Sequence, residues 1–443
     1  MSKPKLTSIS RLSWLGILTR ITERTCEGWK ASVPQIQRRS SMTDPVLSID
    51  VSKENSTAAL FLSQGNLKDK TFTFKHTHKE LSEVLEILKS TEIETGSKAK
   101  VVLEATGNYS TPIVSFFETN GFKVISLNPI ETHLQKNKAV RKVKTDAIDV
   151  VRIANVYYLK GDQLQFRMDD QARNLRTMCR QYDGICEVFS ETQLKFRDFV
   201  EMVFPMYNGI FSDFCSKTSL NVLYHFPSPN AVLEASREEI IKALKLANMP
   251  KKWYQDKVDM LYNAARESLS VNLSQGPFEE AIKDYISILN NLRDNLTRMR
   301  DRMVKLARLS PQFELLLSIP GVGEVTAATI LSEIGDVLNF PTVKQLVAFS
   351  GLDPSVFQSG RFKATKNKIS KRGSNHLRKA LYQATVAGIR KRKGKPVNPV
   401  IFEFYSKKLS EGKAPNVAII AASNKLLRII YGMLKSRTIF STS

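Results

Sequence analysis

Lys144-Thr145-Asp146-Ala147-Ile148-Asp149-Val150-Val151 is the stretch from which the fold of this chain can be worked out. It comes after a run of basic residues and continues into apolar residues at helical spacing. Asp146 and Asp149 are three positions apart, so a helix presents both carboxylates on one face. Two neighbouring anions repel each other, and a divalent metal ion between them removes that repulsion. The stretch therefore predicts a helix that carries half of a metal site.

The residues before this helix predict a mixed α/β domain. Val46–Val51 alternates like a strand, with Asp50 on the opposite face from Leu47 and Ile49. Further strands are predicted over Thr57–Leu62, Lys70–Lys75, Lys100–Glu104 and Phe122–Leu127, and helices over Lys79–Leu88 and Ser110–Thr119. The resulting order βββαβαβα is the connectivity of an RNase H-like (RuvC-like) nuclease domain, which we assign to residues 44–160.

In that connectivity, the middle of the first strand, the end of the fourth strand and the last helix meet at one edge of the sheet. These positions hold four carboxylates, namely Asp50, Glu104, Asp146 and Asp149. Carboxylate oxygens suit two Mg²⁺ ions, with Mn²⁺ as an alternative, and two such ions stabilise both reacting oxygens in phosphoryl transfer. The basic residues before the helix are expected to hold phosphates nearby; they are Lys136, Lys138, Arg141, Lys142 and Lys144.

The net charge of +23 indicates a polyanionic partner, because such an imbalance disfavours compact folding unless it is neutralised. No apolar run approaches the roughly 18 to 20 residues needed to cross a bilayer, which favours nucleic acid over a membrane. Four cysteines without CxxC pairing are typical of reduced thiols in an intracellular protein rather than of a zinc site. We expect a cytoplasmic, nucleoid-associated protein.

Residues 1–43 form a basic extension that differs from the rest of the chain, with eight Lys/Arg against two Glu up to Ser41. This composition is that of a targeting segment, or of a disordered arm that binds nucleic acid. A third reading takes Met42 as the natural start. We favour a disordered arm or the third reading, because the ordered pattern begins directly after Met42.

Residues 161–310 are predicted to be helical. Apolar residues step by three and four from Leu175 to Phe199, and again over four heptads from Phe278 to Leu306. Such spacing predicts a coiled coil, within the chain or between protomers, and the two helices could pack as one antiparallel hairpin. The spacer between them, residues 207–275, shows short helical patterns and no recognisable chemistry.

Residues 311–443 form a third, mainly helical unit. Ile319-Pro320-Gly321-Val322-Gly323 is similar to a helix–hairpin–helix turn, in which Gly321 and Gly323 let backbone amides approach a phosphate, although many such turns are only tight connections. Arg361 to Lys395 holds thirteen Lys/Arg and no acid, interleaved with apolar residues, which indicates a folded basic surface. Its predicted nucleic-acid contacts are Arg361, Lys363, Lys366, Lys368, Lys371, Arg372, Arg378 and Lys379.

Several of these motifs together resemble the DEDD transposases of the insertion sequence 110 family, relatives of the Piv DNA invertase. The N-terminal motifs that carry the resemblance are Ser48–Lys53, Leu103–Tyr109 and Lys144–Asp149. The C-terminal motifs are Ile319–Gly323, Gly351-Leu352, Gln358-Ser359-Gly360 and Ile369–Gly373. The chain departs from the family pattern in its N-terminal extension and at Val150–Ile153.

The resemblance implies a DNA recombinase with a RuvC-like domain, a coiled coil and a transposase domain. It places the family's acidic tetrad on Asp50, Glu104, Asp146 and Asp149 and its serine nucleophile on Ser359. It also implies target and donor DNA, a structured guide RNA from the element, and a dimer or tetramer in which the acids of one protomer meet the serine of another. A serine hydroxyl needs activation to attack at neutral pH, which metal ions can supply.

Other functions are compatible with parts of the sequence. A metal-dependent nuclease or transposase that uses water would leave Ser359 a structural turn residue. A tyrosine recombinase would use Tyr382, but the spacing of His376 and Arg378 is not the HxxR of those enzymes. A non-catalytic nucleic-acid-binding protein would tolerate loss of Asp146. We assign no catalytic role to any of the five histidines.

Overall fold

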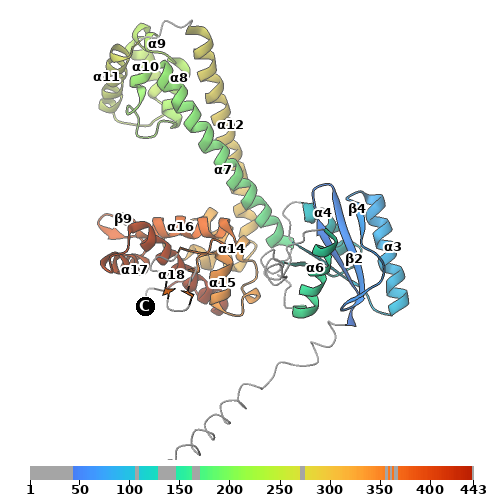
Figure 1. Cartoon of the computed structure of the whole chain (residues 1–443). Helices are drawn as coiled ribbons and strands as arrows, with labels where there is room; N and C mark the ends of the chain where they lie inside the picture. Colours follow the sequence, from blue (N-terminus) through green and yellow to red (C-terminus); the bar gives the residue numbers. More distant parts are fainter. Residues whose placement is uncertain are drawn as a thin grey trace, which may run out of the picture. The chain divides into compact units, whose positions relative to one another are not determined.

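The computed structural model describes, in order, residues 43–104, 109–127, 146–161, 170–269, 275–354, 358–359, 362–363 and 368–441. The chain divides into two compact units, residues 1–166 and residues 167–443 (Figure 1). Residues 1–42 of the basic extension and the predicted phosphate-binding residues between Lys136 and Lys144 lie outside the described residues. The boundaries predicted for four separate domains stay predictions.

The first unit is built on a six-stranded mixed sheet. Its strands are β1 (Val46–Val51), β2 (Asn55–Ser63), β3 (Asn66–Leu67), β4 (Phe72–Lys75), β5 (Lys100–Glu104) and β6 (Val124–Leu127). The strand order is β3-β2-β1-β5-β6, and β4 also pairs with β2. β1 is antiparallel to β2 and parallel to β5, which is parallel to β6. The sequence predicted every strand except the two-residue β3, which directly follows the turn at Gly65.

Helices cover both faces of this sheet. The helices α3 (His78–Thr95) and α4 (Ser110–Thr119) pack on the face that carries Leu47 and Ile49 of β1. The helix α6 (Asp146–Lys160) packs on the other face, where it contributes Val150, Ile153, Ala154 and Tyr157 to a second core. Alternation along the buried strands therefore decides which helix each strand residue faces.

The second unit begins with two long helices that pack side by side (Figure 1), α7 (Asp170–Val203) and α12 (Gln275–Ala307). The ring of Phe199 stacks on that of Phe278 with a centroid distance of 6.0 Å. Further along, the Arg293 guanidinium lies 5.9 Å from the ring centroid of Phe189. Phe199 comes after Phe189 on α7, whereas its partner Phe278 comes before Arg293 on α12. The two helices are therefore antiparallel. The coiled-coil pattern thus packs within one chain.

The spacer between these helices folds into a small helical subdomain, residues 204–269, which we call the cap. Its helices are α8 (Lys217–His225), α9 (Pro229–Glu234), α10 (Arg237–Leu244) and α11 (Lys251–Glu267). Leu220, Ile240 and Leu261 are buried in one core with Phe196 of α7 and Ile282 of α12. The sequence predicted short helices here but showed no sign of this shared core.

The rest of the second unit is mainly helical, with short β-hairpins. Its elements are α13 (Pro311–Leu317), α14 (Glu324–Ile334), α15 (Val343–Ser350), β7 (Gln358–Ser359), β8 (Phe362–Lys363), α16 (Asn375–Ile389), β9 (Lys391–Arg392), β10 (Lys395–Pro396), α17 (Pro399–Ser410) and α18 (Pro415–Ser436). The apolar pattern of Val417–Leu434, within α18, predicts a helix of the core or of an oligomer interface.

By length and composition α18 is apolar enough to cross a membrane, which the sequence pattern had not indicated. It packs instead against α16 and α17, with Ala422, Leu426 and Ile430 buried. A single helix of this kind is weak evidence for a membrane span, since core helices pass the same test. In the described residues α18 has the contacts of a core helix.

Candidate functional site

Asp50 and Glu104 lie at neighbouring positions on adjacent parallel strands. Ile49 of β1 pairs with Leu103 of β5, and the two acids each follow by one residue. Because side chains alternate along a strand, both acids point to the face opposite Ile49 and Leu103. That is the face covered by α6. Both acids are half-buried.

The direction of α6 decides where its own acids lie. Near its C-terminus, the Tyr157 hydroxyl accepts a hydrogen bond from Lys100 Nζ at 2.8 Å, and the Tyr158 hydroxyl donates to the Asp44 carbonyl at 3.0 Å. Lys100 begins β5 and Asp44 precedes β1, so α6 runs antiparallel to both strands. Its first turn therefore lies over the ends of the strands that carry Asp50 and Glu104.

Asp146 and Asp149 occupy that first turn in different environments. Asp146 is exposed, whereas the side chain of Asp149 is only 9% exposed. Arg152 Nη1 donates to Asp149 Oδ1 at 2.7 Å. Asp149 thus already has a cationic partner on its own helix. The structure gathers all four predicted acids at one end of one face.

The four carboxylates are not arranged as the ligands of one metal ion. Among the residues that the structure describes, no three His, Cys, Asp or Glu side chains are close enough to hold one metal ion. The donor chemistry nevertheless suits a hard divalent cation, since all four groups are carboxylates.

Ser359 lies in a short β-hairpin of the second unit. It pairs with Phe362, and Gln358 pairs with Lys363. The described residues on either side form a stem, in which Pro354 pairs with Ile369 and the Ser370 hydroxyl donates to Asp353. Arg361 and Lys366 lie outside the described residues, and for Lys363 only the backbone is described.

The other predicted basic contacts differ in their surroundings. Lys368, Lys371 and Arg372 are exposed beside the hairpin stem. Arg378 Nη1 donates to the Ser350 carbonyl at 3.0 Å, and Lys379 Nζ lies 3.4 Å from Asp183 Oδ1. Arg378 and Lys379 therefore make contacts within the unit. Their role towards nucleic acid stays a prediction.

The two predicted phosphate-binding glycines also differ. Gly321 has φ +97°, and a Cβ there would lie 2.8 Å from Gly388 Cα of α16. Gly321 is therefore needed for close packing. Gly323 precedes α14, and a Cβ there would meet nothing within 4 Å. The open backbone at a helix N-terminus is the arrangement that a phosphate contact requires.

Sequence reasoning missed a buried carboxylate, Glu333 of α14. Its side chain has no exposed surface and accepts from Arg180 Nε at 2.8 Å. The Ser374 hydroxyl, which caps α16, donates to it at 2.8 Å. An acid near the end of the apolar run of α14 was the available signal. Cys179 lies nearby, and burial raises the pKa of its thiol to about 11, so it is protonated at neutral pH.

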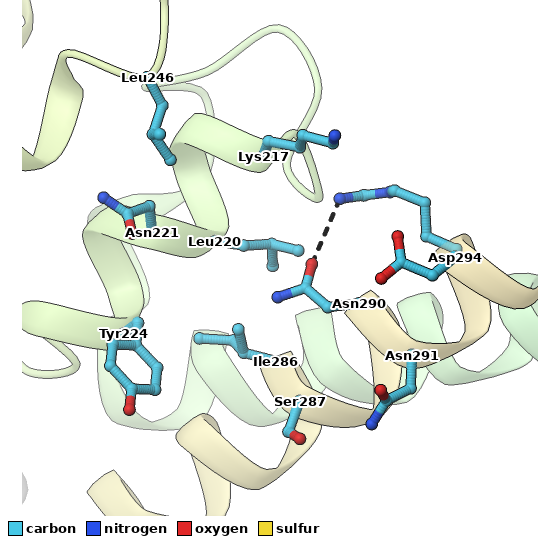
Figure 2. Close-up of a pocket in the computed structure, with 11 residues that line it drawn as sticks. Lys217, Leu220, Asn221, Tyr224, Leu246, Ile286, Ser287, Asn290, Asn291 and Asp294 are labelled. Carbon is cyan, nitrogen blue, oxygen red and sulfur yellow. Dashed lines mark hydrogen bonds between the residues drawn. The ribbon is translucent and has the colours of Figure 1, made fainter. Parts of the chain in front are cut away.

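A pocket lies between the cap and α12 (Figure 2), lined by Leu220 and Asn221 of α8 and by Ile286 and Asn290 of α12. On the α12 side of the pocket, Arg293 Nη1 donates to Asn290 Oδ1 at 3.5 Å. None of the predicted site residues lines this pocket.

Comparison with known proteins connects both units to transposases. A DEDD transposase model of the IS110 group matches residues 47–205, and the Transposase IS116/IS110/IS902 family model matches residues 313–400. The first range holds the four acids, and the second holds Ser359 and the stem of its hairpin.

Curated relatives agree with these models. The chain is 24% identical over 224 residues to an insertion element IS110 protein of Streptomyces coelicolor, covering 50% of this chain and 52% of the relative. It is 29% identical over 171 residues to the pilin gene-inverting protein of Moraxella bovis, covering 37% and 52%. It is 32% identical over 156 residues to the transposase for insertion sequence element IS1111A of Coxiella burnetii, covering 35% and 38%.

The matched part of the chain spans about half the length of the first of these relatives. The two family models together match more than half of this chain, at the segments that carry the predicted motifs. The chain belongs to the IS110 family of transposases.

Proposed function

We propose that this chain is a DNA transposase or site-specific recombinase of a mobile element, cutting and rejoining DNA by phosphoryl transfer. The observation that carries the proposal is the placement of Asp50, Glu104 and the first turn of α6 at one end of one sheet face. Family membership supports it from a separate direction, because relatives are named as transposases and as a gene-inverting protein.

The proposed fold of the first unit is RNase H-like. A mixed sheet with an antiparallel second strand and parallel β1, β5 and β6 supports it. Asp50, Glu104, Asp146 and Asp149 would hold two divalent cations, Mg²⁺ being our choice. Bound there, the cations would stabilise charge on the attacking and leaving oxygens. Because Asp146 is exposed, its side chain has room to turn towards Asp50.

The proposed nucleophile is the Ser359 hydroxyl. Its oxygen would bond to phosphorus, the bond from phosphorus to the leaving sugar oxygen would break, and that oxygen would take up a proton. The phosphoserine linkage conserves the phosphodiester bond energy for rejoining. The short hairpin supports this role, because the backbone pairing of Ser359 with Phe362 gives the serine a defined place in the second unit.

The acids and Ser359 belong to different compact units. We propose that they meet in a dimer or tetramer, the acids of one protomer with the serine of another. We also propose a structured guide RNA from the element that pairs with target and donor DNA; the net charge of +23 supports two polyanionic partners. Sequencing the RNA that co-purifies with the protein tests the guide, and a mixture of unrelated fragments would contradict it.

The experiment that tests the nucleophile looks for protein bonded to DNA. The protein is incubated with end-labelled cognate DNA and Mg²⁺, then run on a denaturing gel. We expect a labelled band at the mass of protein plus DNA, absent for Ser359→Ala. Ser410→Ala, an exposed serine at the end of α17, is the matched control and keeps the band.

Cleavage at the normal rate by Ser359→Ala would overturn the nucleophile assignment. It would favour a metal-dependent nuclease that attacks with water, and the acids would keep their role. Loss of DNA binding by Ser359→Ala would instead show that the hairpin serine is structural.

A further inference from the structure

The hairpin β9–β10, which we call the basic hairpin, joins α16 to α17 (Figure 1) and spans residues 390–396. Five of its residues are cationic and exposed, namely Arg390, Lys391, Arg392, Lys393 and Lys395. They belong neither to the predicted metal site nor to the hairpin β7–β8 that carries Ser359.

These charges have no acidic neighbours along the chain. No Asp or Glu occurs between Asp353 and Glu403 in the sequence. Within the described part of the chain, none of the five cations takes part in an ion pair, whereas Lys408 on the next helix pairs with Glu411 at 2.7 Å. Cations held this close repel each other, so the arrangement costs stability until an anion neutralises it. Within the fold, Lys391 Nζ lies 5.2 Å from the centroid of the Phe402 ring, which gives this cation an aromatic neighbour but no countercharge.

The backbone of the turn is built for a fixed shape. Lys393 has φ +49° and Gly394 has φ +79°. Two successive residues with positive φ form the tight two-residue turn that suits the twist of paired strands. Arg392 pairs with Lys395, and Lys391 pairs with Pro396. The cations therefore stand on a short two-stranded ribbon.

The base of the ribbon is anchored in the core. Asn398 is 1% exposed, its backbone N donates to the Gly388 carbonyl at 2.8 Å, and its Nδ2 donates to the Pro320 carbonyl at 3.1 Å. Gly388 in turn packs against Gly321. The ribbon is thus tied to the same turn that presents the open backbone of Gly323.

We propose that the basic hairpin is a sequence-independent contact for the phosphate backbone of duplex DNA. The inference rests on the proposed function in that DNA is the substrate. A two-stranded β-ribbon fits the major groove of B-form DNA, about 12 Å wide, whereas the major groove of A-form RNA is too deep and narrow for side chains to read. Uncompensated Lys and Arg on such a ribbon meet phosphates along the groove.

The test compares two triple variants of the full-length protein that lose the same charge. The hairpin variant is Arg392→Gln, Lys393→Asn and Lys395→Gln, since Asn tolerates positive φ. The control variant is Lys245→Gln, Lys251→Gln and Lys252→Gln, three exposed cap residues. Binding to a fluorescent random-sequence DNA duplex is measured at several salt concentrations, with circular dichroism to check folding.

We expect the salt dependence of binding, as log K against log salt, to fall by about 2 to 3 for the hairpin variant, near 0.9 for each lost contact. The control should change by less than about 1. The loss should be equal on unrelated DNA sequences and smaller on double-stranded RNA.

If both variants lost the same amount of DNA binding, the hairpin cations would contribute only through net charge, and the inference would be overturned. Unchanged binding by the hairpin variant, with a wild type that binds steeply, would overturn it and leave the proposed function standing. A larger loss on RNA than on DNA would overturn the choice of DNA. A wild type that binds no duplex would contradict the proposed function itself.

Discussion

Arg180 and Glu333 form a two-point contact inside the second unit. Arg180 Nε donates to Glu333 Oε1 at 2.8 Å, and Arg180 Nη2 donates to Oε2 at 3.2 Å. The arginine belongs to the long helix α7 and the carboxylate to α14, 153 residues later. Because Ser374 binds the same carboxylate and caps α16, the contact links α7 to the helix that comes after the serine hairpin.

Glu333→Ala should therefore destabilise the protein by about 1–3 kcal/mol, because it removes a fully buried carboxylate that accepts hydrogen bonds from Arg180 and Ser374 and lies beside the half-buried Arg176 guanidinium. Arg176 Nη2 lies 3.7 Å from Glu333 Oε2. Urea unfolding at neutral pH measures the change. Glu314→Ala, which removes an exposed pair with Arg308, is the control and should cost less than about 1 kcal/mol. A Glu333→Ala protein as stable as this control would contradict the structural role of the carboxylate.

The same carboxylate predicts a pH dependence. Burial alone would raise the pKa of Glu333, but the hydrogen bond from Arg180 and the charges of Arg176 and Arg180 outweigh it and hold the pKa below its usual value. A carboxyl whose pKa is lower in the folded state than in the unfolded state adds to the free energy of unfolding. This contribution is fully present at pH above the unfolded-state pKa of 4.5, and it is lost as the pH falls through the folded-state pKa.

Glu333→Gln lacks this titration. Its deficit in unfolding free energy relative to wild type should be largest at neutral pH and shrink in acid below about pH 4. Urea unfolding in a series of buffers measures it. A deficit that stays constant down to about pH 3 would show that the carboxylate is not ionised in the fold.

Glu104→Gln or Asp146→Asn should abolish strand cleavage, by about 100-fold or more, while DNA binding survives. Each change removes a metal-binding charge but keeps the shape. Cleavage of labelled cognate DNA and a separate binding assay are the measurements, and a chelator should stop cleavage by wild type in the same way. Glu83→Gln, an exposed acid on α3 against the opposite face, is the control. Asp149 is left out because its substitution also frees Arg152.

A mixture of two inactive proteins should regain activity if the site is shared between protomers. Asp146→Asn keeps Ser359, and Ser359→Ala keeps the acids, so a mixed oligomer holds one complete site. Tags of different length identify the chains on a denaturing gel. We expect the DNA to be bonded only to the Asp146→Asn chain. No recovery after co-refolding would argue that each site is formed within one chain.

The two glycines of the helix–hairpin–helix turn should behave oppositely. Gly321→Ala should destabilise the protein by about 2–4 kcal/mol, because its Cβ would lie 2.8 Å from Gly388 at a φ of +97°. Gly323→Ala should leave stability within about 1 kcal/mol and weaken DNA binding, since its Cβ has open space that a phosphate would otherwise approach. Thermal unfolding and binding assays separate the two, and a stable Gly321→Ala protein would contradict the packing.

Much of the fold could be predicted because its patterns are local. Alternation in Val46–Val51 and the steps of three and four along α7 and α12 depend only on residues near one another in the chain. The sheet-edge placement of Asp50 and Glu104 followed from connectivity. The cap could not be predicted as a subdomain, because its core joins short helices to Phe196 and Ile282, which lie on either side of it.

The sequence by itself predicted most of the helices and strands, located the carboxylates, and carried the net charge of +23 from which a polyanionic partner is expected. Only the tertiary structure decided that α7 and α12 are antiparallel within one chain, that Gly321 packs on Gly388, and that Glu333 binds Arg180. The physical reason is distance along the chain. The periodicity of apolar residues shows which face of a helix or strand is buried. It does not show which element packs against that face, because that depends on segments that are far apart in the chain.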